Sequence, residues 1–419
     1  MRHQFEQIVP VDAVAMSVDR GSMLGMQESS APTPPLTVAG LFAGIGGLER
    51  GLQASGARAE LLCEWWEPAQ QVLRHHFPHA RLHGDISTLD ALPDVDIVTA
   101  GFPCTDLSQA GRTAGIHGKA SGLVKHLFEL LADASPTWVV VENVRNMLML
   151  DGGTAMEYLV TEFERLGFRW AYRLVDSRFT GVPQRRQRVI MVASRTQDPS
   201  AVIFADDAGE PKADVLRSDA FGFYWTEGSR GLGWAQDALP TLKGGSGLGI
   251  ASPPALWVPG AAPGRAVLTP SIEDAEALQG FPRGWTEPAL EVGRRGSRWK
   301  AVGNAVTVGV STWVGRRLAQ PGAFDHTGHI ILPKGSRWPN AAWGDSDGRW
   351  EVQASLWPER RPYQHLLDIV DASEAAPLSY RATNGFYSRL QASRLRYDTA
   401  FGVAVKQHAE WMWETDKAA

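Results

Sequence analysis

Short apolar runs alternate with amphipathic stretches from residue 36 to about residue 193. TVAGLF, AELLC, VDIVTA and TWVVVE are each followed by a stretch of helical character, for example near 123–134 and 154–166. Strands that alternate with helices predict a parallel sheet with helices on both faces. The last two runs, RWAYRLVD and RVIMVA, lie close together in the sequence, which predicts an antiparallel hairpin at one edge of that sheet.

The composition indicates a globular chain rather than a disordered one. Hydrophobic residues make up 44% of the 419 residues, which is enough for two or three domains with buried cores. Residues 1–35 lack a continuous apolar core and end in a proline-rich run, so we expect a flexible leader rather than a signal peptide. No window of about 18 apolar residues predicts a membrane span. Two cysteines in this length predict a reducing, cytoplasmic location.

Positive charge is clustered along the chain, although the net charge is −5. The negative total argues weakly against a nucleic-acid partner, because phosphate binding usually requires an excess of Lys and Arg. Two clusters argue the other way: Arg165, Arg169, Arg173, Arg178, Arg185, Arg186, Arg188 and Arg195, and then Arg283, Arg294, Arg295, Arg298 and Lys300. Each cluster is either a solvated basic face or part of a nucleic-acid surface.

Changes of pattern divide the chain into further parts. Over residues 197–264 the alternation gives way to Gly, Pro, Trp and Ser, which predicts a small irregular domain. Residues 265–318 return to helical character, and we expect them to rejoin the α/β domain of residues 36–196. Residues 319–419 hold a tryptophan-rich segment and a predicted pair of helices over residues 379–413, and this extension either adds to a ligand surface or buttresses the fold.

Three strand ends carry residues suited to a nucleoside ligand. The glycines of LFAGIGG lie in the turn after the first strand, where the missing Cβ atoms let the backbone approach a ligand. Glu64 ends the second strand about 20 residues later, where a carboxylate can accept hydrogen bonds from ribose hydroxyls. Trp65 can cover an adenine face, and Asp85 in HGDIS can accept from an adenine amino group. The alternatives are a plain tight turn, a core tryptophan and a capping aspartate.

A second group of motifs includes a cysteine that is expected to be accessible at the end of a strand. Cys104 lies in GFPCTDLSQAG, directly after the VDIVTA strand, and Cys63 is the only other cysteine. Cys104 is therefore a candidate nucleophile rather than half of a disulfide. Glu142 in ENV and the arginines of PQRRQR follow at other strand ends, and ligand sites in such sheets lie beyond the carboxyl ends of the strands. The alternatives are a packed thiol, a helix-capping glutamate and arginines paired with carboxylates at the sheet edge.

The motifs occur in the order FAGIGG, CEWWEPA, GDI, GFPC, ENV, PQRRQRV, LQGFP and GNAV. In this order and spacing the chain resembles the cytosine-5 DNA methyltransferase family over about residues 36–318. The resemblance implies methyl transfer from S-adenosyl-L-methionine (AdoMet) to carbon 5 of a cytosine in double-stranded DNA, with S-adenosyl-L-homocysteine as product. It implies a doubly wound, mostly parallel α/β sheet of the AdoMet-dependent methyltransferase fold, a target recognition domain over residues 197–264, and a bacterial or phage enzyme of DNA modification such as restriction-modification.

The resemblance also assigns residues to sites by motif position. The AdoMet site would comprise Phe42, Gly44, Ile45, Gly46, Gly47, Glu64, Trp65, Asp85, Ile86, Pro103, Leu123, Asn304 and Val306. The catalytic residues would be Cys104, Glu142, Arg186 and Arg188. A loop after Cys104 would meet the DNA and the hole left by the flipped cytosine, through Ser108, Gln109, Arg112 and Lys119. Thr105 departs from the Gln that many members carry, which puts the local hydrogen bonding of this loop in question.

The chemistry of cytosine explains why these residue types belong together. Carbon 5 is a poor nucleophile until another group adds to carbon 6, and a thiolate suits that addition because it is nucleophilic near neutral pH and can leave again. The addition builds negative charge toward ring nitrogen 3, where Glu142 can donate a proton if a dry pocket raises its pKa. Arg186 and Arg188 would face the base carbonyl oxygen and the thiolate. A base that the sequence does not identify, with water as one candidate, then removes the proton of carbon 5.

The recognition region is small, which predicts a short target, a dinucleotide to tetranucleotide. Arg230 and Lys243 are candidates for base or phosphate contact, although surface turns of this composition are common. We expect the enzyme to act as a monomer on DNA. We also expect it to need no metal ion, because the histidines form no ligand cluster in the sequence. Two other readings stay open: an RNA cytosine-5 methyltransferase acting on tRNA, and a catalytically silent DNA-binding relative.

Overall fold

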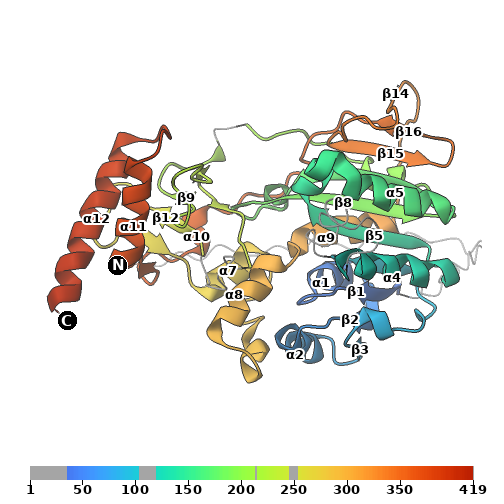
Figure 1. Cartoon of the computed structure of the whole chain (residues 1–419), viewed down its shortest axis with the longest axis horizontal. Coiled ribbons are helices and arrows are strands. Elements are labelled where there is room, and N and C mark those ends of the chain that lie inside the picture. The colour runs from blue at the N-terminus through green and yellow to red at the C-terminus, as the bar shows by residue number, and fades with distance from the viewer. Residues whose placement is uncertain (1–34, 103–118, 213–214, 245–252, 419) are drawn as a thin grey trace, which may run out of the picture. The chain divides into compact units, whose positions relative to one another are not determined.

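The computed structural model describes residues 35–102, 119–212, 215–244 and 253–418. Most of the expected leader and the segment around Cys104 lie outside these ranges. The main layer is a ten-stranded sheet in the order β14-β16-β15-β6-β8-β5-β4-β1-β2-β3 (Figure 1). Its strands are β1 (Thr37–Leu41), β2 (Arg58–Cys63), β3 (Arg81–His83), β4 (Ile97–Ala100), β5 (Trp138–Val144), β6 (Arg169–Asp176), β8 (Gln187–Ser194), β14 (Ile330–Ile331), β15 (Ala341–Asp345) and β16 (Gly348–Glu351).

The strand directions confirm the predicted α/β sheet with a parallel half, but the whole sheet is mixed rather than mostly parallel. β3, β2, β1, β4 and β5 run parallel to one another, and β8 runs antiparallel between β5 and β6. The β6–β8 hairpin exists, but its predicted position at the sheet edge is wrong. β15 pairs with β6 and is followed outward by β16 and β14, so strands from the C-terminal extension continue the sheet beyond the hairpin.

Helices cover both faces of the sheet because its central strands are apolar on both sides. In β5, Val139 and Val141 belong to the core beneath α4 and α5, whereas Val140 belongs to the core beneath α9. Burial on both faces explains the continuous apolar run WVVV, and full burial of each valine stabilises the fold by roughly 1.5–3 kcal/mol. The helices of these layers are α1 (Gly47–Gln53), α2 (Glu67–His76), α4 (Lys119–Asp133), α5 (Thr154–Arg165), α6 (Ser200–Ile203) and α9 (Val308–Ala319).

A second, five-stranded sheet is built from the recognition region, the C-terminal extension and, contrary to the expectation that residues 265–318 return entirely to the α/β domain, the strand at residues 267–269. Its order is β10-β9-β12-β13-β17, and the small strand β11 pairs instead with β7, just before β8. These strands are β7 (Gln184–Arg185), β9 (Phe221–Phe223), β10 (Ala235–Gln236), β11 (Leu239–Pro240), β12 (Ala255–Trp257), β13 (Val267–Thr269) and β17 (Ala376–Pro377). The associated helices are α7 (Ile272–Leu278), α8 (Arg295–Asn304), α10 (Leu366–Ile369), α11 (Tyr380–Gln391) and α12 (Thr399–Ala418).

The terminal helix pair expected from the sequence is present as α11 and α12. The ring of Phe223 on β9 lies 5.0 Å from the rings of Phe386 on α11 and Phe401 on α12. All three side chains are fully buried, so the helices share a core with the second sheet. The end of the C-terminal extension therefore buttresses the recognition region. Among the residues described, no helix combines the length and apolar character needed to cross a membrane.

Candidate active site

The turn after β1 is built for close approach of a ligand. Phe42, Gly44 and Gly46 all have positive φ angles, of 56°, 57° and 79°. A Cβ on Gly46 would lie 2.4 Å from the Phe77 ring, so this glycine is required by both conformation and space. A Cβ on Gly44 would have no neighbour within 4 Å. The backbone at Gly44 is therefore open on the side where a ligand would lie.

Glu64 is fixed at the end of β2, facing this turn. Its Oε2 accepts from Gly44 N and its Oε1 accepts from Trp66 N, both at 2.8 Å. Burial raises the pKa of the Glu64 carboxyl, and the two backbone hydrogen bonds partly oppose that rise. A carboxylate has about four acceptor positions, so further bonds from two ribose hydroxyls remain available.

The residues expected around an adenine ring lie after β2, after β3 and on α4. Trp65 is 72% exposed, which excludes the core-tryptophan alternative and leaves its ring free to cover a base. Asp85 accepts from Ser87 N at 2.9 Å and so caps the short 3₁₀ helix η1 (Ile86–Thr88), as the capping alternative required. Ile86 is buried and Leu123 on α4 is half-buried. This set fits an adenosine group, with Gly44 open, Glu64 fixed and Trp65 exposed.

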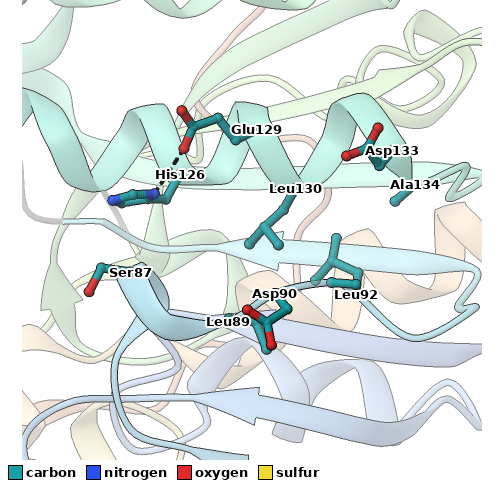
Figure 2. Close-up of a pocket in the computed structure, with 10 residues that line it drawn as sticks. Ser87, Leu89, Asp90, Leu92, His126, Glu129, Leu130, Asp133 and Ala134 are labelled. Carbon is teal, nitrogen blue, oxygen red and sulfur yellow. Dashed lines mark ion pairs between the residues drawn. The ribbon is translucent and has the colours of Figure 1, made fainter.

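Figure 2 shows a neighbouring pocket between η1 and α4, with a volume of about 330 Å³. Its polar lining includes Asp90, Glu129, Asp133 and His126, and His126 Nδ1 lies 2.9 Å from Glu129 Oε2. The residues assigned to the AdoMet site do not line this pocket. It is therefore separate from the proposed adenosine position.

Glu142 lies at the end of β5 against the start of the GFPC motif. A Cβ on Gly101 would lie 3.9 Å from Glu142 Oε2, and Glu142 is only 7% exposed. Its Oε1 lies 2.8 Å from Nε of Arg188, at the start of β8. Burial lowers the pKa of Arg188, while the Glu142 carboxylate opposes this effect. An arginine held against a carboxyl group in a buried site fixes the orientation of that carboxyl through a charge-assisted contact.

Asn143, which sequence reasoning did not single out, ties ENV to Phe102 at the start of the GFPC motif. Its Nδ2 donates to the carbonyl oxygen of Phe102 at 3.1 Å, and its Oδ1 accepts from Val144 N at 2.9 Å. Asn143 and Phe102 are both 3% exposed. Pro103 and Cys104 follow Phe102 directly but lie outside the described residues. The asparagine of the ENV motif was the only feature of the sequence that could have indicated this contact, because the two residues lie 41 positions apart.

Arg186 occupies a different environment from the one expected for a residue facing the base. Its guanidinium donates to the carbonyl oxygens of Leu242, Gly303 and Ala305, at 3.0, 3.2 and 2.7 Å. The residue is 1% exposed, and its Nε is buried without a hydrogen-bond partner among the described residues. In this structure Arg186 therefore joins the catalytic sheet to the recognition region and to the GNAV motif.

A buried amide network, also missed from the sequence, extends this junction. Gln184 Nε2 donates to the Leu278 carbonyl and to Gln279 Oε1, at 2.9 and 3.0 Å. Gln279 Nε2 donates to the Val302 and Ala305 carbonyls, at 3.0 and 3.2 Å. Gln184 and Gln279 are fully buried. PQRRQR, LQGFP and GNAV thus meet in one polar cluster, which explains why all three motifs contain polar residues that the chemistry does not use.

The other residues that the sequence assigned to the AdoMet, catalytic and DNA sites lie in different parts of the structure or outside its described residues. Val306 is buried against Gly47, and Asn304 is exposed beside Gly244. Lys243 pairs with Glu227 at 2.5 Å and lies 3.9 Å from the Tyr224 ring centroid, and Arg230 is exposed. Ile45 is buried. Outside the described residues or side chains are Pro103, Cys104, Ser108, Gln109, Arg112 and Lys119. Within the described ranges, no group of three or more His, Cys, Asp and Glu side chains is arranged to hold a metal ion.

Comparison with known proteins agrees with this fold. Residues 36–218 match the family described as C-5 cytosine-specific DNA methylase. The chain is 45% identical over 381 residues to the Type II methyltransferase M2.BsuMI of Bacillus subtilis (strain 168), covering 87% of this chain and 96% of that protein. It is 31% identical over 157 residues to the Type II methyltransferase M.HhaI of Haemophilus parahaemolyticus, covering 37% and 48%. The crystal structure of S. pombe Dnmt2 methyltransferase superposes with a TM-score of 0.51 at 15% identity, covering 68% and 98%.

Together, the doubly wound sheet and the motif-bearing carboxyl edge define an AdoMet-dependent methyltransferase fold. The similarity to M2.BsuMI extends over almost the full length of both chains. The chain belongs to the C-5 cytosine-specific DNA methylase family, and it is a DNA (cytosine-5)-methyltransferase.

Proposed function

We propose that the enzyme methylates carbon 5 of a flipped-out cytosine in a short duplex target, through a covalent bond between Cys104 Sγ and carbon 6. The observation that carries this proposal is the position of Glu142, whose carboxyl group lies beside Gly101 at the start of the GFPC turn. The parallel β4–β5 pair and the hydrogen bond of Asn143 to Phe102 hold Gly101 and Phe102, which lead into Cys104, beside this carboxyl group.

Each protein group has one task in this reaction. The Cys104 thiolate adds to carbon 6, and Glu142 donates a proton or hydrogen bond at nitrogen 3, so that carbon 5 becomes nucleophilic. AdoMet, when bound, supplies an electrophilic methyl group. Carbon 5 takes up this methyl group, with S-adenosyl-L-homocysteine as the leaving group, and then loses its proton to a base. The carbon 6–sulfur bond breaks to return the thiolate, and the proton at nitrogen 3 returns to Glu142. Arg188 holds the Glu142 carboxyl in place, and Asn143 positions the turn that carries Cys104.

The AdoMet site of this proposal comprises the turn after β1 and the end of β2. Gly44 allows close approach, Glu64 accepts from the ribose, and Trp65 covers the adenine. The Glu64 carboxyl is already oriented by Gly44 N and Trp66 N, so binding requires no search for its rotamer.

The two cysteines offer a matched test. Purified enzyme and methyl-labelled AdoMet are incubated with duplex plasmid DNA or with tRNA, and the wild type should label cytosine carbon 5 in the DNA. Cys104→Ala should abolish labelling. Cys63→Ala should retain it, because Cys63 is buried in β2 and its pKa is raised to about 12, mainly by burial and then by Glu64 and Asp85. Labelled tRNA beside unlabelled DNA would overturn the proposal in favour of an RNA substrate.

A further inference from the structure

A groove at the catalytic edge is shared between the ENV segment and the C-terminal extension. Its volume is about 370 Å³, and it is lined by Arg145, Leu148, Met149, Arg337, Trp338, Pro339, Asn340 and Glu351. Residues 145–149 come directly after β5, and residues 337–340 come directly before β15. The groove therefore lies between residues that follow the ENV motif and a segment of the C-terminal extension, which is outside the motif-bearing residues 36–318.

The sheet topology places this groove beside Glu142. β5 and β6 both run antiparallel to β8, so their carboxyl ends lie at the same edge. Asn340 lies at the carboxyl half of β6, because its carbonyl accepts from Leu174 N at 2.7 Å. Arg145 is three residues beyond Glu142 along the chain. Both arginines of the groove are thus presented at the edge that carries the proposed chemistry.

Each arginine of the groove has a defined neighbour. Arg145 Nη1 donates at 2.8 Å to Oε1 of Gln187, which stands between Arg186 and Arg188. Trp338, next to Arg337, is 6% exposed and packs against Trp170 and Tyr172 with ring centroids 6.1 and 6.2 Å apart. Arg337 is therefore attached to a buried anchor, although its own side chain is exposed.

The charges of the groove suit an anion. Neither Arg145 nor Arg337 forms an ion pair within the described part of the chain, whereas many other arginines of the protein are paired. Glu351 lines the groove too, so the lining carries two positive charges and one negative charge. Two exposed guanidinium groups with fork geometry match the oxygens of a phosphodiester.

We propose that this groove binds the phosphodiester backbone of duplex DNA beside the flipped cytosine. The proposal rests on the proposed function, because it takes duplex DNA as the substrate. It gives the C-terminal extension a direct part in DNA binding through Arg337, in addition to its packing against the recognition region. Phosphate contacts of this kind position the duplex and carry no sequence information.

The test compares Arg145→Gln, Arg337→Gln and the double variant with Arg81→Gln as control. Arg81 is exposed at the start of β3, so the control removes the same charge from a distant site at the amino end of a strand. Binding of a labelled duplex is measured by fluorescence anisotropy between about 50 and 200 mM salt, with and without the target sequence. Each groove variant should weaken binding by roughly tenfold for both duplexes and reduce the salt slope by about one. The control should match the wild type.

Equal affinity and equal salt slope for the wild type and the double variant would overturn the proposal. Loss of affinity for a structured RNA but not for duplex DNA would assign the groove to RNA and also overturn it. Arg337→Lys keeps the charge but not the fork, so it should retain the salt slope; it provides a second test if Arg337→Gln unfolds. Methylation by the wild type is measured separately. If the wild type does not methylate DNA but the groove variants still reduce the salt slope, the proposed function is refuted and the proposal about the groove is not.

Discussion

Removal of the Asn143 side chain is expected to slow the reaction more than it weakens substrate binding. In Asn143→Ala, the carbonyl oxygen of Phe102 loses its 3.1 Å hydrogen bond inside a site where both residues are 3% exposed. An unpaired buried carbonyl costs about 1–3 kcal/mol. If that cost appears as displacement of the turn that carries Cys104, kcat should fall roughly 5- to 150-fold.

Single-turnover methylation of a duplex under saturating AdoMet measures this effect, together with the KM for AdoMet and the thermal unfolding midpoint. Asn146→Ala is the matched control, because it removes the same amide from an exposed position three residues away. Asn143→Asp can still accept from Val144 N but cannot donate to Phe102 when ionised, so it should be slow as well. A variant that is less stable yet methylates at the wild-type rate would refute the positioning role of Asn143.

Three further predictions follow from buried and exposed side chains. Burial raises the pKa of Glu49, so ionising this carboxyl costs stability once the pH rises above the ordinary value for glutamate, 4.5. The stability advantage of Glu49→Gln over the wild type in urea unfolding should therefore grow as the pH rises above that value, and a difference independent of pH would contradict this. Arg186→Met leaves the buried carbonyls of Leu242 and Gly303 unpaired, whereas the Ala305 carbonyl keeps its bond from Gln279, and it should lower the free energy of unfolding by about 3–5 kcal/mol in the same assay. Trp65→Ala should weaken AdoMet binding in calorimetry while leaving the unfolding free energy within about 0.5 kcal/mol, since this ring is 72% exposed.

The sheet could be predicted from the sequence because its strands are short apolar runs separated by helical stretches. β5, with six consecutive buried residues, shows the pattern most clearly. The error in the position of the β6–β8 hairpin has a physical reason. β15 and β16 contain Gly, Asp, Arg and Trp in place of a β-branched run, and β15 is assembled by pairing with a strand about 170 residues earlier, which local patterns do not encode.

The candidate site was predictable where the chemistry itself requires a residue type. Glu64 faces the glycine turn, and Glu142 faces the start of GFPC, as their places at strand ends indicated. The contacts that hold these groups were not predictable. Arg186 reaches carbonyls up to 119 residues away, and the Gln184–Gln279 pair spans 95 residues, so only the folded chain reveals that these polar side chains are structural.

A duplex with 5-fluorocytosine at the target position tests the central claim most directly, because fluorine cannot leave carbon 5 as a proton does. In the presence of AdoMet, the wild type and Cys63→Ala should form a denaturation-resistant complex with this duplex, one enzyme per target, and peptide mapping should place the DNA on Cys104. Cys104→Ala should form none. A wild-type enzyme that methylates ordinary duplex DNA but traps no complex, or that traps it through another residue, would contradict the account.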